Sequence, residues 1–75
     1  MSVEMLRRLY GWAWDDLMKL QGFREAVRKL EEAEKNGGFR HAAAELAESL
    51  QSLPVDADNL HLVVLGRNLE RILRL

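Results

Sequence analysis

The side chains of this sequence best suited to binding chemistry are two closely spaced tryptophans and a row of arginines. Indoles and arginines are enriched among the residues that dominate protein–protein binding energy, and a guanidinium can form paired hydrogen bonds with a carboxylate or phosphate. An aromatic contact surface is predicted from Tyr10, Trp12, Trp14 and Met18. A second, electrostatic surface is predicted from Arg67, Arg71 and Arg74, which follow an i, i+4, i+7 spacing.

Residues for catalysis or metal binding form no recognisable motif. The sequence has no cysteine, and its three serines lack the flanking patterns of serine nucleophiles. His41 to Glu45 and Asp58 to His61 have ligand-type spacings, but no glutamate stands three residues before either histidine, as helical dimetal sites require. We therefore predict no enzymatic activity, no metal site and no cofactor.

Composition predicts an all-α domain. Leu occurs 14 times and Ala 8 times, whereas five Val and one Ile are the only β-branched residues and Thr is absent. Strands favour β-branched and aromatic residues, and helices favour Leu, Ala, Glu, Lys and Arg. With 75 residues, the chain is expected to form a single domain over 1–75 whose small core favours self-association.

Charge and hydropathy exclude several partners. Eleven Lys and Arg against twelve Asp and Glu give a net charge of −1, so no overall field attracts the chain to nucleic acid or to an anionic membrane. The longest apolar run, 62–65, is far shorter than the roughly 20 residues of a membrane span. We see no signal peptide and expect a cytoplasmic protein without membrane contact.

Helix-start and helix-stop residues predict four segments. Gln21-Gly22 marks a break, Gly37 is placed to adopt a left-handed conformation after a helix, and Pro54 cannot continue one. The predicted helices are 2–20 with Ser2 as N-cap, 23–36, 39–53, and a last one running from Asp56 or Asp58 to the C-terminus.

A short repeated motif bears on how these helices pack. The motif at 22–26 recurs sixteen residues later at 38–42, each time as Gly-Phe-Arg-x-Ala. One interpretation is a pair of similar helices forming a central antiparallel αα-hairpin within a compact three- or four-helix bundle. The alternative is that this motif is simply a favourable opening for an amphipathic helix.

The predicted first helix has an unusually wide apolar surface. Its main stripe comprises Leu6, Leu9, Ala13, Leu17 and Leu20, and its other apolar residues widen the arc to about 240°. Trp12 and Trp14 lie about 200° apart on such a helix, so if one is in the core the other is expected near the surface. Either both indoles are core, or this helix contacts a second copy or another protein.

The last segment allows two interpretations at its start and two for its arginines. Residues 60–65 are apolar nearly all round, and a helix is favoured over a short unpaired strand. The arginine row either binds phosphates or carboxylates, or is a solvated face on which Glu70 pairs with Arg67 or Arg74.

These observations favour a small non-enzymatic protein–protein interaction module, an adaptor or regulatory subunit that forms a homodimer through its first helix. An alternative is a nucleic-acid-binding regulator, because 43–50 resembles the first helix of a helix-turn-helix and the arginine row could contact phosphates. A further alternative is a designed helical protein without a natural function, given the Leu, Ala and Glu bias.

Overall fold

The computed structural model describes residues 2–74, and within them every regular element is a helix and none is a strand. The predicted all-α class is therefore confirmed, and 60–65 is helical. The helices are α1 (Val3–Tyr10), α2 (Ala13–Leu17), α3 (Gln21–Lys35), α4 (Phe39–Gln51) and α5 (Leu60–Leu73).

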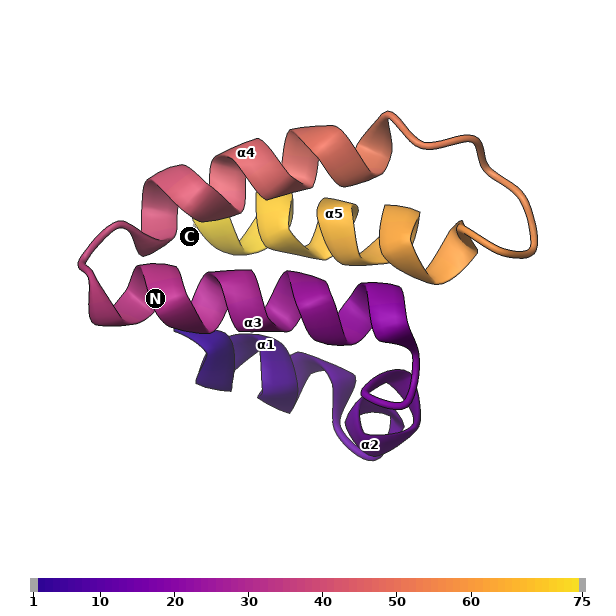
Figure 1. The fold of residues 1–75 in the computed structure, drawn as a ribbon, viewed down its shortest axis with the longest axis horizontal. Coiled ribbons are helices and arrows are strands. Elements are labelled where there is room, and N and C mark those ends of the chain that lie inside the picture. The colour runs from indigo at the N-terminus through magenta and orange to yellow at the C-terminus, as the bar shows by residue number, and fades with distance from the viewer. Residues whose placement is uncertain (1, 75) are drawn as a thin grey trace.

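The longer helices lie along the long axis of a molecule measuring 33 × 25 × 21 Å (Figure 1). The most extensive helix–helix contact joins α4 and α5, while α3 contacts α1, α4 and α5. Helix α2 is a single short turn at one end of the molecule, between α1 and α3 (Figure 1). The packing of α3 with α4 is compatible with the predicted hairpin, but α4 and α5 form the principal pair.

The predicted first helix over 2–20 is wrong, because the chain breaks at Gly11. Gly11 adopts φ 57° and ψ −129°, and its N–H closes α1 on the Arg7 carbonyl at 3.0 Å. Glycine reaches such positive φ values without the steric cost that other residues incur. A second interruption occurs at Leu20, which is extended, so that α3 begins at Gln21 instead of at the predicted Phe23.

The remaining boundaries agree with the prediction only in part: α4 ends at Gln51 and not at 53, and the residue at the N-cap of α5 is Asn59 and not Asp56 or Asp58. Gly37, with φ 77°, ends α3, and the amide of Gly38 donates to the Ala33 carbonyl at 2.8 Å, as in a Schellman cap. Before α5, Asp56 Oδ1 accepts hydrogen bonds from the amides of Asp58 and Asn59, both at 3.0 Å. Helix α5 ends at Leu73, and residue 75, to which the last helix was expected to extend, lies outside the described residues.

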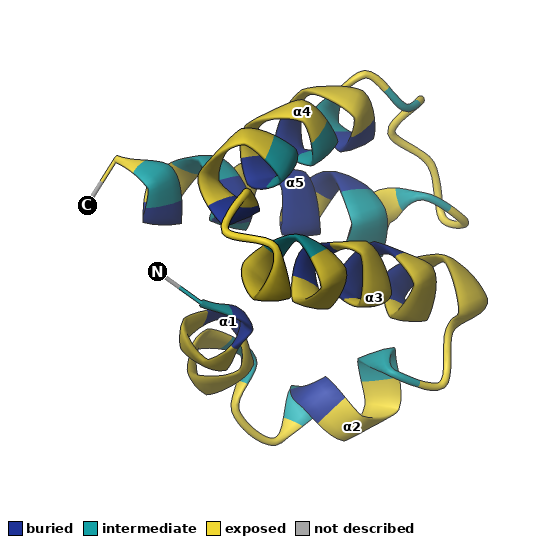
Figure 2. Ribbon diagram, turned by 60° about the vertical axis from the view of Figure 1, so that its left-hand side comes forward, coloured by how far each residue is buried: buried dark blue, intermediate teal, exposed yellow. Residues whose placement is uncertain are grey.

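The core is apolar and is shared by α1 to α5. Buried positions of α3, α4 and α5 face one another, whereas the outer surfaces of these helices are exposed (Figure 2). Gly66 permits the closest helix approach, since a Cβ at this position would lie 3.0 Å from both the Ala47 carbonyl oxygen and Leu50 Cβ. No helix within 2–74 is long and apolar enough to cross a membrane.

Candidate functional site

Three aromatic rings hold the first part of the chain against α3. Trp14 and Phe23 meet edge to face with ring centroids 5.5 Å apart, and Tyr10 meets Phe23 in the same way at 5.6 Å. Tyr10 and Trp14 are 6.3 Å apart. We call these three residues the aromatic cluster. Its geometry is the favourable one for aromatic packing, and it uses two residues of the predicted contact surface as core.

The Tyr10 hydroxyl connects the aromatic cluster to α5. Its oxygen accepts a hydrogen bond from Asn68 Nδ2 at 2.9 Å. Burial raises the pKa of Tyr10 above its ordinary value of 10.0, and the donated hydrogen bond opposes part of that increase. The contact fixes the end of α1 beside the middle of α5.

The two tryptophans have opposite environments. Trp14 is buried at 9% exposure, whereas Trp12, on the turn that follows Gly11, is 87% exposed. The expectation that one indole lies in the core and the other near the surface is thus met, although a glycine turn separates them and not a continuous helix. Met18 is partly buried against the core. Of the four predicted aromatic-surface residues, Trp12 alone offers most of its side chain to solvent.

A small surface pocket lies between α1 and α5. It is lined by Leu9, Asn68, Arg71 and Ile72 and has a volume of about 160 Å³; we call it the Leu9 pocket. Leu9 is 53% exposed and forms an apolar wall, and Ile72 is buried behind it. Polar groups at the rim come from Asn68 and Arg71. The pocket joins α1 to α5 on the side where Tyr10 contacts Asn68.

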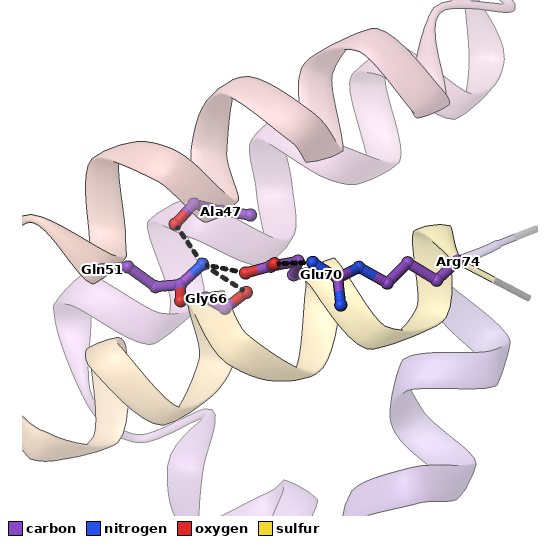
Figure 3. A network of polar contacts seen from close by, with 5 residues as sticks. All are labelled: Ala47, Gln51, Gly66, Glu70 and Arg74. Atoms are coloured by element: carbon purple, nitrogen blue, oxygen red, sulfur yellow. Dashed lines mark hydrogen bonds and ion pairs between the residues drawn. The ribbon is translucent and has the colours of Figure 1, made fainter.

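The three predicted arginines are not equivalent. Arg74 Nη2 binds Glu70 Oε1 at 2.6 Å, and Glu70 Oε2 accepts from Gln51 Nε2 at 2.8 Å (Figure 3). Arg67 and Arg71 are exposed, and neither forms an ion pair with another residue of 2–74. The electrostatic surface is therefore reduced to these two arginines, and one of them lines the Leu9 pocket.

A larger hollow of about 380 Å³ follows the seam between α4 and α5. Gln51 lies in it and donates to the Ala47 carbonyl at 3.2 Å and towards the Gly66 carbonyl at 3.5 Å, in addition to Glu70 (Figure 3). The polar groups of this seam thus satisfy one another. We interpret it as part of the helix packing.

The histidines offer little for metal binding. His41 Nε2 lies 3.0 Å from Glu45 Oε1 on the exposed face of α4, the i, i+4 spacing noted in the sequence. Within 2–74 there is no group of three or more His, Cys, Asp or Glu residues arranged to hold a metal ion.

Sequence reasoning missed Leu9 and Asn68 as site residues. Leu9 was placed in the core stripe of a helix running to Leu20, and the break at Gly11 removes the downstream part of that stripe. Asn68 carries no motif, and its role depends on the contact with Tyr10. The one sequence signal that could have corrected the placement of Leu9 is Gly11, which follows Tyr10 and ends the helix there.

No family model matches this chain, and neither a curated protein nor a solved structure matches it. The functional argument therefore rests on the residues and geometry described above.

Proposed function

We propose that this protein is a non-enzymatic protein–protein interaction module, an adaptor or regulatory subunit, that self-associates through its first segment around Trp12. The observation that carries the proposal is the 87% exposure of that indole. The free energy falls when a partner covers a large aromatic side chain that is otherwise exposed to water. Tryptophan is also enriched in binding hot spots.

The exposed apolar residues of α1 and α5 provide area for an interface of ordinary size. Leu9 and Met5 add exposed apolar area on α1, and Leu60 and Val64 add more on α5. The chain exposes 5138 Å², so an interface of roughly 800 Å² per partner would cover about one-sixth of it. We also expect a chain with such a small core to gain stability when it associates.

The arrangement of the helices into a hairpin and bundle is also part of this proposal. We propose that α3 and α4 form the antiparallel hairpin of a compact helical bundle acting in the cytoplasm, with α1 and α2 added to one side. This arrangement would leave Trp12 at an edge where a second copy can approach.

The test is the molar mass in solution as a function of concentration, measured by light scattering after size-exclusion chromatography. We expect a dimer at high concentration that dissociates on dilution. Trp12→Ala should weaken association by more than about 1 kcal/mol without loss of helical circular dichroism. Val55→Ala, which also trims an exposed apolar residue, serves as the matched control. A monomer at every concentration would contradict the proposal.

A nucleic-acid-binding function is the second candidate, and it is favoured by Arg67 and Arg71, which have no ion-pair partner among residues 2–74. Against it, α5 exposes Leu60 and Val64 on the turns before these arginines, and α4 and α5 pack along their lengths. Binding to random duplex DNA should then weaken steeply with salt and lose part of that dependence in Arg71→Ala. Absence of binding at low salt would eliminate this candidate.

A further inference from the structure

We infer that the Leu9 pocket is the receptor for Trp12 of a second copy, so that two chains exchange their indoles reciprocally. The inference rests on the proposed self-association and names the contact that produces it. Its components are the exposed indole, the pocket and the short distance between them.

The size and lining of the pocket suit an indole. A cavity of roughly 150 Å³ accommodates an aromatic ring such as benzene, and the Leu9 pocket has about 160 Å³. The Leu9 and Ile72 side chains provide apolar walls for the ring. Ile72 is buried at 7% exposure, so Leu9, at 53%, supplies most of the exposed apolar surface of this pair.

The polar groups at the rim match the two electrostatic features of tryptophan. Arg71 has no carboxylate partner within 2–74, so its guanidinium can lie over the electron-rich face of the ring as a cation–π contact. Asn68 donates its amide hydrogen to Tyr10, which leaves the amide oxygen to accept the indole N–H. An acidic side chain would also suit Arg71 but would gain nothing from the apolar walls.

The position of Trp12 relative to the pocket favours a closed dimer. Trp12 follows Leu9 by three residues, so their Cα atoms are at most about 11 Å apart. Its own indole does not fill the pocket, since it is 87% exposed. When a protruding group and its receptor are neighbours on one surface, a two-fold axis brings both copies of the contact into one interface.

The same reciprocity provides a complementation experiment. Trp12→Ala removes the indole and keeps the pocket, whereas Arg71→Glu or Leu9→Glu keeps the indole and spoils the pocket. Each variant homodimer loses both contacts, and we expect its dissociation constant to rise by at least about 30-fold. A mixed dimer of Trp12→Ala with either pocket variant retains one intact contact, so mixing should restore association by about 10-fold relative to either variant alone.

Sedimentation equilibrium of each variant and of the mixtures measures these constants. Arg28→Glu, an exposed charge reversal on α3, is the control and should leave association unchanged. Circular dichroism checks that each variant is folded, and the two pocket variants test the same claim through different side chains. Failure of the mixtures to associate better than the single variants would overturn the inference.

The remaining outcomes separate this inference from the proposed function. A monomeric wild type would contradict both. A dimeric wild type whose dissociation constant rises in Trp12→Ala but is unaffected by the pocket variants would overturn the indole exchange and leave the proposed self-association around Trp12 standing. A dissociation constant that none of these variants changes would contradict both and place self-association on another face.

Discussion

The α4–α5 pair and the α1–α2 segment are held in place by different kinds of contact. Along the pair, Gly66 lets the two backbones approach closely, and Gln51 of α4 reaches α5 through its hydrogen bond to Glu70. The α1–α2 segment consists of helices of 8 and 5 residues, too short to be stable alone, anchored by the aromatic cluster. Continuous packing thus builds the scaffold, and a few anchors suffice to hold the segment that presents Trp12.

The largest effect expected from this comparison concerns the two tryptophans. Trp14→Ala should lower the free energy of unfolding by about 3–5 kcal/mol, because it removes a ring from the aromatic cluster and leaves a cavity. Trp12→Ala should change it by less than about 0.5 kcal/mol at concentrations where the chain is monomeric. Urea unfolding followed by circular dichroism measures both. Equal losses at the two positions would mean that Trp12 is not free in solution.

A smaller effect is expected where the helices of the scaffold approach most closely. Gly66→Ala adds a methyl group 3.0 Å from the Ala47 carbonyl oxygen, a backbone atom that cannot easily move. Overpacking of about 1–3 kcal/mol, offset by a helix-propensity gain of up to about 1 kcal/mol, predicts a net loss of about 1–2 kcal/mol.

Gly22→Ala is the matched control for this change. Its added methyl would meet Leu62 Cδ1 at 3.3 Å, the end of a flexible side chain. We expect a neutral or slightly stabilising effect, of at most about 1 kcal/mol. Similar thermal shifts for Gly22→Ala and Gly66→Ala would show that close backbone approach does not distinguish the α4–α5 seam.

The hydrogen bond between Tyr10 and Asn68, which links α1 to α5, should have the smallest effect on the free energy of unfolding. Tyr10→Phe removes the hydrogen bond with Asn68 and should cost about 0.5–1.5 kcal/mol. Because burial raises the pKa of Tyr10 in the folded state, its stabilising contribution is present below pH 10.0 and is lost as pH rises through the folded-state pKa.

Measuring the free energy of unfolding from about pH 9 to about pH 11.5 isolates the contribution of the Tyr10 hydroxyl. Tyr10 is the only tyrosine, so the difference between wild type and Tyr10→Phe cancels the titration of lysines. That difference should shrink as the pH rises. A constant difference across this range would mean that the pKa of Tyr10 is not raised in the folded state and would contradict the burial of its hydroxyl.

How far the sequence predicts this structure depends on whether local or long-range contacts decide each feature. The all-α class follows from composition, and the end of α3 at Gly37 is set by short-range hydrogen bonds, so its role could be predicted. Gly11 was not identified as a break, because glycine occurs inside helices at modest cost and apolar spacing appeared to continue beyond it. The break at Gly11 and the second interruption at Leu20 together overturned the expected continuous helix over 12–20.

The candidate site was also predictable only in part, because some of its contacts are local and others join distant parts of the chain. The exposure of one indole could be inferred from angular spacing alone, but which one required knowledge of the turn. Arg74 was a plausible member of an arginine row until Glu70 was fixed by Gln51 from another helix. The Leu9 pocket joins residues 63 positions apart in sequence, and no local pattern indicates such a contact.

The most direct test of the account is the tryptophan emission of the wild-type protein over a wide range of concentration. Trp14 is already buried in the single chain, so changes on association report on Trp12. We predict a shift to shorter wavelength and reduced acrylamide quenching as the dimer forms, both absent in Trp12→Ala. An emission spectrum and a quenching constant that stay the same from dilute to concentrated solution would show that Trp12 remains in water and would contradict the account.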